Sequence, residues 1–516
     1  MAVPVSIDQL TLEGGARHRG VTLSVLCVTL LLISLDNTVL NVALPSIART
    51  LHASSSELQW MVDAYAIAFA GLLLSLGTLG DHVGRKWVFM AGLVTFGGGS
   101  AFAAWSKSPD VLTTARAVMG VGAAALMPCT LSILTNVFIT ERDRARAIGI
   151  WSATTGIGVA LGPILGGFLL AHFWWGSVFL INVPIAVAGL VGTALFVPNS
   201  RNVHAARPDP IGAVVSMVGF SLLLWGIIEA PSRGWSSPLI LGSLVGGLAI
   251  LAVFIFWERH VDHPMLPLRF FSNRRYSVAI SALALVLFAL LGMFFLMTQY
   301  LQFDLGYSAL EAGVRIAPVA LTLLVIAPLS VLVAHSIGTK YVVCAGLCLV
   351  ALAFGLLSRT TVYGTYRDIL VPFIIVGIGV ALALAPCTES VMGSLPRGEA
   401  GVGSATSDTA MQVGGALGVG VLGTALNLRY QHLMAHAASH ASVPASIKKL
   451  IEGSLGAALA VAHRAPRNLG QELASVARRS FVSGMDEALI IACVVTALAA
   501  LVVAALLPNY GAEVRE

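Results

Sequence analysis

The sequence predicts an all-α integral membrane protein with fourteen transmembrane helices. Of the 516 residues, 57% are hydrophobic and only 11% are charged, and the mean hydropathy is +0.88, whereas soluble domains carry about 25% charged residues. Long uncharged runs recur along the chain, and a helix needs about 20 apolar residues to cross the bilayer. Helices are expected because lipid cannot satisfy free backbone groups. This composition excludes a soluble enzyme, a disordered protein and a nucleic-acid-binding domain.

The crossings are read from runs that contain no Asp, Glu, Lys or Arg. The first crossing, 20–44, is interrupted only by Asp36. The run 147–200 is too long for one helix, and we expect it to break at 172–176, where two tryptophans suit a membrane–water interface. The other runs are 64–80, 87–106, 117–140, 210–228, 234–257, 276–303, 316–339, 341–358, 369–388, 409–428 and 488–512.

The distribution of positive charge predicts the orientation. With the N-terminus in the cytoplasm, the tails and the loops after even-numbered helices carry sixteen Lys or Arg, against five in the short loops of the opposite face. Cytoplasmic loops carry the excess of such residues, so we expect both termini inside. Arg17 and Arg19 precede an apolar stretch without a small-residue cleavage site, which predicts that the first helix is retained. All six cysteines lie in apolar runs, which predicts no disulfide framework.

A weak internal repeat divides the chain. The segment 80–86 is matched 254 residues later by 334–340, where Gly338 and Lys340 keep the positions of Gly84 and Lys86. Parallel repeats of six helices form a transporter architecture with a site at their interface. The predicted organisation is a cytoplasmic tail at 1–20, a six-helix bundle at 21–198, a linker with two helices at 199–276, a second six-helix bundle at 277–507 and a cytoplasmic tail at 508–516.

The segment 427–484 is expected to be a polar, alanine-rich loop on the outer face, with short amphipathic helices around 446–463. Within it His432, His436 and His440 recur at a spacing that places them on one helix face. Such a row suits a metal or pH-sensing site or an ordinary solvated helix surface, and we prefer the solvated surface.

Charge inside a membrane is costly and marks functional candidates. Asp36 lies deep in the first helix, and Arg116 lies early in the fourth helix, from which its long side chain can reach the level of Asp36. An arginine partner favours the charged carboxylate and burial opposes it, so a balanced pair can exchange its proton for a cation. The alternative is a static ion pair that fixes the bundle.

Two further acids lie within predicted helices. Asp63 and Trp60 share one face of the second helix, and a carboxylate beside an aromatic ring suits a lipophilic cation. Asp408 lies about 10 Å into the thirteenth helix at about 1.5 Å per residue, with Gln412 one turn further on. Asp63 is otherwise an interfacial residue beside a belt tryptophan, and Asp408 is a candidate for a second proton or substrate carboxylate.

Two motifs are candidates for conformational change. The charged turn 77–86 can form an inner gate or simply anchor the topology. The fifth helix carries closely spaced glycines and a proline, which permit close packing and a kink but are also consistent with tight packing alone. The candidate residues are Gly77, Asp81, Gly84, Arg85, Lys86, Gly158, Gly162, Pro163, Gly166 and Gly167.

Several motifs are absent from the sequence. It contains no phosphate-binding G-x-x-x-x-G-K-[ST] loop, no H-E-x-x-H and no G-x-S-x-G. We therefore expect no catalytic residue, no metal and no cofactor, and we expect an ion gradient to supply the energy.

Four motifs in chain order resemble those of the major facilitator superfamily, specifically its fourteen-helix drug:proton antiporter branch. The stretch 35–45 is similar to the branch's signature in helix 1, and 77–86 to the superfamily's G-x-L-x-D-x-x-G-R-K loop. The stretch 116–122 is similar to the R-x-x-x-G-x-G pattern of helix 4, and 158–167 to the antiporter motif of helix 5. The segment 60–65 and the outer loop are most similar to the antiseptic-exporting (QacA-like) subgroup.

The resemblance implies the major facilitator fold, which has two six-helix bundles plus, in this branch, two additional helices. It also implies proton-coupled export of lipophilic, often cationic dyes, antiseptics and antibiotics. Asp36 would be the main proton-binding carboxylate, Arg116 its partner, and Asp63 and Asp408 accessory carboxylates. The residues expected to line the substrate cavity are Asn37, Asn41, Trp60, Tyr65, Met127, Gln299 and Gln412.

Other functions stay open at this point. The same fold exporting an endogenous metabolite or lipid is the main alternative, and a channel or a sensor without transport is a third class. The expected partners are small drug-like molecules, protons and the lipid bilayer, with no nucleic acid. We expect a bacterial cytoplasmic membrane protein that is sufficient as a monomer.

Overall fold

The computed structural model describes residues 19–201, 208–262, 264–266, 268–362, 364–395, 400–439 and 444–508. Every regular element in these ranges is a helix, and fourteen of the helices are long and apolar enough to cross a membrane. The predicted all-α class with fourteen crossings is therefore confirmed. The run 147–200 breaks where expected, because α6 ends at His172 and α7 begins at Ser177.

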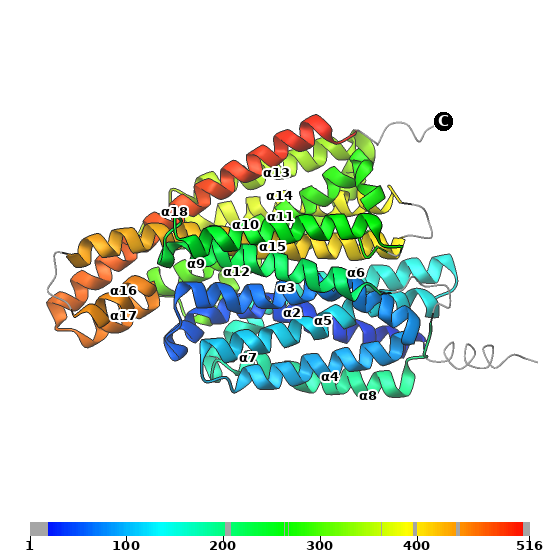
Figure 1. The fold of residues 1–516 in the computed structure, drawn as a ribbon, viewed down its shortest axis with the longest axis horizontal. Coiled ribbons are helices and arrows are strands. Elements are labelled where there is room, and N and C mark those ends of the chain that lie inside the picture. Colours follow the sequence, from blue (N-terminus) through cyan, green and yellow to red (C-terminus); the bar gives the residue numbers. More distant parts are fainter. Residues whose placement is uncertain are drawn as a thin grey trace, which may run out of the picture.

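The first helical half forms the lower part of Figure 1, coloured blue to cyan. Its last two helices, α7 and α8, together make one crossing, Ser177–Phe196. The half consists of α2 (Arg19–Leu51), α3 (Ser55–Val83), α4 (Arg85–Ala104), α5 (Pro109–Val137), α6 (Glu141–His172), α7 (Ser177–Leu180) and α8 (Asn182–Phe196).

The second half forms the upper part of Figure 1 and follows a linking hairpin in the sequence. In the hairpin, α9 packs against α3 of the first half and α15 of the second, and α10 packs against α9. The hairpin and the turn that follows it are α9 (Pro210–Arg233), α10 (Pro238–His260) and η1 (Leu268–Ser272). The second half is α11 (Arg274–Gln299) with its π-helical end η2 (Tyr300–Asp304), α12 (Ala309–Ile337), α13 (Thr339–Leu357), α14 (Tyr366–Met392), α15 (Ala400–Ser439), α16 (Ala445–Gly453), α17 (Leu455–Arg464) and α18 (Arg467–Leu506).

The internal repeat extends to the starts of corresponding helices. Helices α3 and α12 both have 29 residues. Each begins with a capping box, formed by Ser54 with Glu57 and by Ser308 with Glu311. In this motif the serine and glutamate side chains satisfy backbone N–H groups that the first helical turn leaves free. The two boxes are 254 positions apart, which is the offset seen in the turn motif.

The repeat also fixes the ends of the same two helices. Gly84 follows α3 with φ of 124°, and Gly338 follows α12 with φ of 103°. Residues with a Cβ rarely adopt such angles, so glycine is required at both turns. The conserved geometry explains why the glycine of the short repeat recurs in a sequence that otherwise diverges.

Helices α15 and α18 extend beyond the rest of the molecule. Each has 40 residues, or about 60 Å, twice the roughly 30 Å of hydrocarbon. With α16 and α17 they form the lobe at the left of Figure 1. The expected loop 427–484 is thus largely helical, because α15 continues to Ser439 and α18 begins at Arg467. Charged residues mark the membrane edge, whereas an alanine-rich sequence favours helix on both sides of it.

The short helices expected around 446–463 are present as α16 and α17. Of the three histidines in this segment, His432 and His436 lie on α15, and His440 lies outside the described residues. No group of three metal-ligating side chains is found within the part of the chain that the structure describes.

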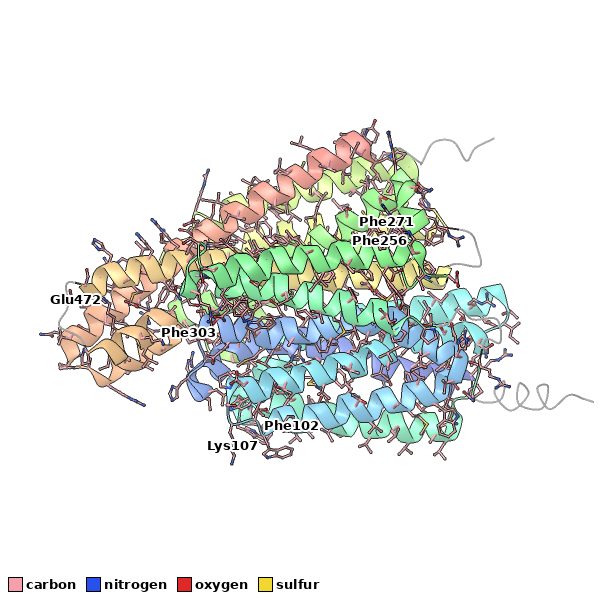
Figure 2. All side chains as sticks on the ribbon, viewed as in Figure 1. Phe102, Lys107, Phe256, Phe271, Phe303 and Glu472 are labelled. Carbon is pink, nitrogen blue, oxygen red and sulfur yellow. The ribbon has the colours of Figure 1, made fainter. Side chains whose placement is uncertain are left out.

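Two ends of the molecule are named for what they carry. The terminal face holds the start of α2 and the end of α18, and the lobe face holds the lobe and the α2–α3 turn (Figure 1). Between them the flanks carry exposed apolar side chains, such as Phe102 and Phe256, whereas Glu472 lies on the lobe (Figure 2). Apolar flanks of this extent suit contact with lipid.

Candidate functional site

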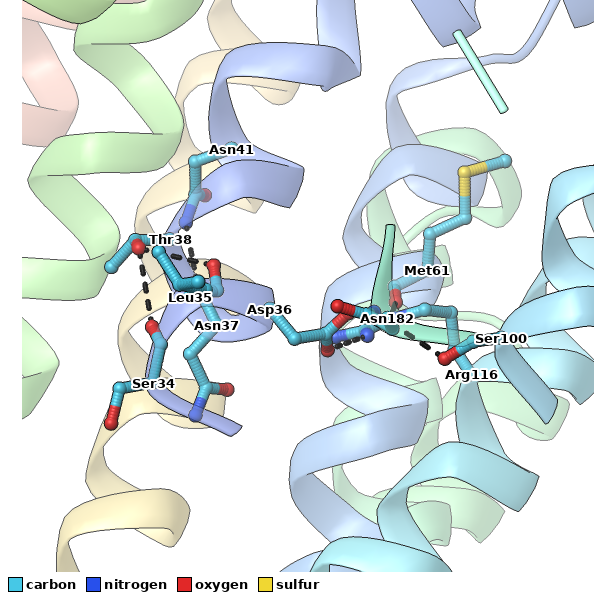
Figure 3. A network of polar contacts seen from close by, with 10 residues as sticks. All are labelled: Ser34, Leu35, Asp36, Asn37, Thr38, Asn41, Met61, Ser100, Arg116 and Asn182. Carbon is cyan, nitrogen blue, oxygen red and sulfur yellow. Dashed lines mark hydrogen bonds and ion pairs between the residues drawn. The ribbon is translucent and has the colours of Figure 1, made fainter. Parts of the chain in front are cut away.

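A buried ion pair joins α2 and α5 inside the first half. Arg116 Nη1 donates to Asp36 Oδ2, and each side chain is only 2% exposed. In Figure 3 the Asp36 side chain points from α2 toward Arg116 and away from Ser34 and Thr38. The two charges singled out in the sequence are therefore brought into direct contact.

An amide from α8 completes the surroundings of the carboxylate. Asn182 Nδ2 donates to Asp36 Oδ1 at 3.1 Å and lies 3.3 Å from Ser100 Oγ on α4. Both carboxylate oxygens of Asp36 thus have a partner. A buried charge pair is tolerable only when further hydrogen bonds satisfy its remaining polar atoms, and Asn182 supplies one of them.

Arg116 is held from a third helix, α3. Its Nε donates to the backbone oxygen of Met61 at 3.1 Å, and its guanidinium carbon lies 4.3 Å from the centre of the Tyr65 ring. A guanidinium over an aromatic face gains cation–π attraction, which is larger where water is excluded. The site therefore links α2, α3, α4, α5 and α8 through one pair of charges.

Two polar side chains that follow Asp36 on α2 are engaged by their own helix. Thr38 Oγ1 donates to the Ser34 and Leu35 carbonyls, both at 3.2 Å, and Asn41 Nδ2 donates to the Asn37 carbonyl at 3.2 Å. These bonds satisfy hydroxyl and amide groups in apolar surroundings. In Figure 3 the Asp36 side chain, by contrast, reaches across to Arg116 of α5 and Asn182 of α8.

The glycine motif of α6 packs against the opposite side of α2. A Cβ at Gly158 would lie 2.5 Å from Ser34 Cβ, and a Cβ at Gly162 would overlap the Thr38 hydroxyl. Gly166 follows at the same four-residue spacing and also faces α2. This row lets the two backbones approach closely, so it fixes α2 from behind the ion pair.

The same stretch of α6 also meets the second half. A Cβ at Gly167 would lie 2.6 Å from the Ala309 carbonyl of α12, and Gly313 of α12 packs against the Pro163 carbonyl. The glycine motif of α6 therefore packs against two helices, α2 of the first half on one side and α12 of the second half on the other.

Asp63 lies at the seam between the halves rather than in the ion pair. The residue is fully buried, and neither carboxylate oxygen has a hydrogen-bond partner among the described residues. Gln59, one turn earlier, donates to the Val419 and Gly420 carbonyls of α15, both at 3.1 Å. Trp60, expected beside Asp63, packs instead with an apolar cluster that includes Leu224 of α9.

Asp408 lies far from the other two acids along the membrane normal. It is eight residues from the start of α15 at the terminal face, or about 12 Å. Gly420, level with Gln59, is twelve residues further along the same helix, about 18 Å away. Asp408 is half-buried and has no ion pair with any residue that the structure describes.

The residues expected to line a substrate cavity are distributed over several environments. Tyr65 and Gln299 are buried, and Gln299 donates to the Phe295 carbonyl of its own helix. Asn37, Met127 and Gln412 are half-buried, on α2, α5 and α15. The seven residues come from α2, α3 and α5 of the first half and from α11 and α15 of the second, and their place in a substrate cavity stays a prediction.

The charged turn 77–86 binds helices of the first half to one another. Arg85 Nε lies 2.7 Å from Asp81 Oδ1, and Arg85 Nη1 donates to the Ser132 carbonyl of α5. Lys86 Nζ donates to the Ala194 carbonyl of α8. These contacts tie α3, α4, α5 and α8 together at the terminal face.

Gly77 makes a close contact in the same region, because a Cβ there would lie 3.1 Å from Pro128 Cβ on α5.

Sequence reasoning missed Asn182, Ser100, the Met61 carbonyl and Gln59. Asn182 and Gln59 are detectable as amides within or beside apolar runs, whereas a backbone carbonyl leaves no signal in a sequence.

The fold and the site together define a polytopic membrane carrier, with two repeated helical halves and buried charges where the halves and their helices meet. Residues 26–419 match the Major Facilitator Superfamily. The chain belongs to this superfamily and is accordingly a multi-pass secondary transporter and not an enzyme.

Curated relatives span nearly the same length. The chain is 34% identical to the multidrug efflux pump LfrA of Mycolicibacterium smegmatis, covering 94% of this chain and 95% of that protein. It is 32% identical to the methyl viologen resistance protein SmvA of Salmonella typhimurium, covering 89% and 92%. It is 31% identical to the tetracenomycin C resistance and export protein of Streptomyces glaucescens, covering 93% and 90%.

Solved structures agree on the fold. A bacterial homologue of the human lysosomal transporter Spinster superposes with a TM-score of 0.63 at 16% identity, covering 94% of this chain and 97% of that one. A peptide transporter of the POT group gives a TM-score of 0.60 at 15% identity, covering 94% and 95%.

Proposed function

We propose that this chain is a proton-coupled exporter of lipophilic, cationic small molecules. The names of several relatives support drug-like cargo, because they describe a multidrug efflux pump, a methyl viologen resistance protein and an antibiotic export protein. The single observation that carries the coupling is the buried contact of Asp36 with Arg116 and Asn182.

The coupling step follows from that contact. When Asp36 takes up a proton, it loses its charge and its attraction for Arg116. The pair links α2 to α5, and Arg116 is also bonded to α3. Loss of the attraction between Asp36 and Arg116 therefore weakens the contacts among three helices. Arg116 then lies buried without its counter-charge, a costly state that favours rearrangement of the bundle. Proton binding and helix movement are thereby linked in our proposal.

Asp63 adds a second carboxylate at the seam. A buried, unpaired charge is unfavourable, so a closed seam is compatible with a protonated Asp63. Opening the seam would expose the side chain and allow the proton to leave or a cation to bind. Asp408, near the other end of the crossing, is proposed as a third, accessory carboxylate for a cation that enters from the terminal face.

We place the terminal face in the cytoplasm of a bacterial cell and the lobe outside the cytoplasmic membrane. The excess of Lys and Arg in the tails and in the loops of that face supports this orientation. A monomer is proposed as the transporting unit, because each chain has both repeated halves.

The test uses purified protein in liposomes under an imposed pH gradient. Wild-type protein is expected to move ethidium in a gradient-dependent manner, and Asp36→Asn is expected to lower the initial rate at least tenfold. Asp110→Asn is the matched control, because Asp110 is exposed at the start of α5. It should transport at the wild-type rate.

Each other outcome has a defined meaning. Transport by Asp36→Asn at the wild-type rate would contradict the coupling role of this carboxylate. Inert ethidium in both proteins, with gradient-driven movement of an endogenous lipid or metabolite, would establish the alternative cargo for the same fold.

A further inference from the structure

A cavity of the molecule lies away from the ion pair. It is a cavity of about 540 Å³ between α3 of the first half, α11 and α15 of the second, and the hairpin α9–α10 with η1. Ligand pockets of drug size have volumes of about 300–1,000 Å³. On α3 it extends from Ala66 to Leu74, about 12 Å along the helix.

The cavity is closed on its lobe side. There Ala66 and Ile67 of α3, Leu224 and Ile228 of α9 and Ala416 of α15 form one apolar cluster. The seal is reinforced where Thr424 Oγ1 donates to the Ile227 carbonyl at 3.1 Å. The hairpin therefore rests across the seam of the two halves and covers the cavity from the outside.

On its terminal side the cavity is limited by the segment after α10. Met265 and Leu266 line it, and the Leu266 N–H donates to the buried Glu258 side chain at 2.8 Å. The start of α9 is fixed nearby, since Ser75 Oγ donates to the Asp209 carbonyl and Trp257 Nε1 to the Asp209 carboxylate. The Ser75 bond holds the start of α9 against α3, and the Trp257 bond joins the end of α10 to the start of α9.

The wall of the cavity is apolar and reaches the lipid-facing surface. Ile255 of α10 and Phe271 of η1 both line it and are exposed, at 44% and 36%. In Figure 2 Phe271 lies on the flank beside Phe256, toward the terminal face. The cavity thus adjoins the lipid-facing surface at Ile255 and Phe271.

The polar groups of the wall are few and uncharged. The described lining residues include no Asp, Glu, Lys, Arg or His, and their only polar side chains are hydroxyls. One of these, Thr409 Oγ1, is buried and has no hydrogen-bond partner among the described residues. A lipid acyl chain cannot satisfy a hydroxyl, whereas a compact molecule with one acceptor can.

We propose that this cavity is a binding site for uncharged lipophilic molecules that carry one hydrogen-bonding group, admitted from the bilayer past α10 and η1. This site would extend the proposed exporter function from cations to neutral compounds. Binding at the cavity is independent of that function, and only transport of the bound compound rests on it. The site lies between the levels of two carboxylates. Asp63 is one turn from Ile67 on α3, and Asp408 directly precedes Thr409 on α15.

Benzophenone is a suitable ligand for the test because it is neutral, has one carbonyl acceptor and inserts into nearby C–H bonds when irradiated. Methionine is a favoured target, and Met217 and Met265 line the cavity. Purified full-length protein in lipid nanodiscs would be irradiated with increasing benzophenone, and adducts located by peptide mass spectrometry. We expect saturable labelling at Met217 or Met265.

Three variants sharpen the assignment. Ala410→Phe places a ring in the wall and should lower cavity labelling at least tenfold. Val245→Phe is the matched control, because the Val245 side chain on α10 is 66% exposed. This variant should be labelled to the same extent as wild type. Thr409→Val keeps the shape, removes only the unpartnered hydroxyl and should lower labelling about two- to tenfold. It also serves if Ala410→Phe fails to fold.

The inference would be overturned by non-saturable labelling spread over lipid-facing helices, or by cavity labelling that neither Ala410→Phe nor Thr409→Val reduces. Labelling that appears only after delipidation, together with a phospholipid released from wild type but not from Ala410→Phe, would assign the cavity to a lipid and also overturn it. The test needs no gradient, so its failure is separate from that of ethidium export. Saturable cavity labelling in a protein that moves no ethidium would support the site and contradict the proposed export of cations.

Discussion

Asn182 has a larger part in the site than its place in an apolar stretch suggests. Its amide bonds to the Asp36 oxygen that Arg116 leaves free, and it lies within reach of Ser100 as well. The residue is the first of α8 and follows the short helix α7. The break between α7 and α8 thus brings an amide to the level of a buried carboxylate.

Replacing Asn182 with alanine is expected to destabilise the protein. The change removes a hydrogen bond to a charged group, so the free energy of unfolding should fall by about 1.5–3 kcal/mol. Equilibrium denaturation in mixed micelles measures the difference. Asn468→Ala, at an exposed position early in α18, should stay within about 0.5 kcal/mol of wild type. Equal effects of the two substitutions would show that the Asp36–Asn182 bond has no special weight.

At the residue scale, the sequence predicts the charges better than their surroundings. Asp36 and Arg116 are conspicuous because charge within a crossing is rare, and the structure joins them. Asp63 is conspicuous for the same reason, yet its place at the seam depends on how α15 packs against α3. Packing between elements distant in the chain is what a single sequence leaves open.

Helix α6 packs closely against α2 because the α6 residues at the contact are glycines. Its glycines face α2 at a four-residue spacing, directly behind the segment that carries Asp36. Any added atom on this face must displace α2 or α6, and because α2 also holds Asp36, such a displacement reaches the ion pair.

Gly162→Ala is therefore expected to impair both stability and transport. The new Cβ would overlap the Thr38 side chain, and overpacking of this kind costs about 1–3 kcal/mol. Thermal unfolding and ethidium transport measure the two effects. Gly149→Ala on the same helix is the control, because a Cβ there meets nothing within 4 Å. Thr38→Ala should partly rescue Gly162→Ala, and strict additivity of the two changes would rule out the contact.

The turns after α3 and α12 offer a test of the repeat. Gly84→Ala and Gly338→Ala each place a Cβ on a residue with positive φ, and holding such a residue in a sparsely populated backbone region costs about 1–3 kcal/mol. Both variants should unfold at lower denaturant concentration, and Gly84→Ala at the lower of the two, because its Cβ would also lie 2.7 Å from Asn199 Oδ1. Gly98→Ala, within α4 and facing open space, should not. A clear loss at only one turn would show that the two repeats have diverged in their requirements.

At the scale of elements, helix positions are well predicted and helix ends are not. Uncharged runs mark the part of each helix that lies in lipid, and each of the fourteen crossings is present. The ends of α15 and α18 lie well beyond these runs, because water permits a helix to continue wherever its residues favour one. The distribution of charge indicates where a helix enters and leaves the lipid, whereas capping residues and glycines indicate where the helix itself begins and ends.

Contacts between the halves gather toward the lobe face. Gln302 Nε2 donates to the Val42 carbonyl at 2.9 Å, and Gln59 bonds to α15. Nearer the lobe, Ser55 Oγ donates to the Gly453 carbonyl at 3.2 Å, and Ser454 Oγ to the Ala53 carbonyl at 3.4 Å. The structure is thus closed on the lobe side, and carriers of this architecture work by rocking one half against the other.

Holding the lobe face closed should stop transport. A cysteine pair at Ser55 and Ser454, joined by oxidation or by a short bis-maleimide, would link α3 to α17 across the seam. We expect ethidium transport to fall to background on cross-linking and to return when the disulfide is reduced.

The controls for this experiment are of two kinds. Each single cysteine variant, treated in the same way, should keep its activity. A pair at Thr22 and Phe196, which are hydrogen-bonded within the first half, should tolerate its cross-link. Full transport by the linked Ser55–Ser454 protein would mean that the lobe face need not open.

For the whole molecule, the repeat offset is the most informative signal in the sequence. One offset of 254 residues relates turn motifs, capping boxes and helix lengths, and it is visible without a structure. The cavity beneath the hairpin leaves no such signal, because its walls come from six separate elements whose apolar residues look like ordinary lipid-facing ones.

The projecting helices α15 and α18 turn the lobe into a lever. They run without interruption from the second half to the lobe, and about 30 Å of each lies beyond the hydrocarbon thickness. A rotation of about 15°, as in other two-state assemblies, would swing the lobe by on the order of 8 Å. A spin label at exposed Glu472, with a second at exposed Lys107 of the first half (Figure 2), would read the angle between the halves as one distance. A label on the lobe would thus report the relative orientation of the two halves from outside the hydrocarbon, without disturbing the membrane.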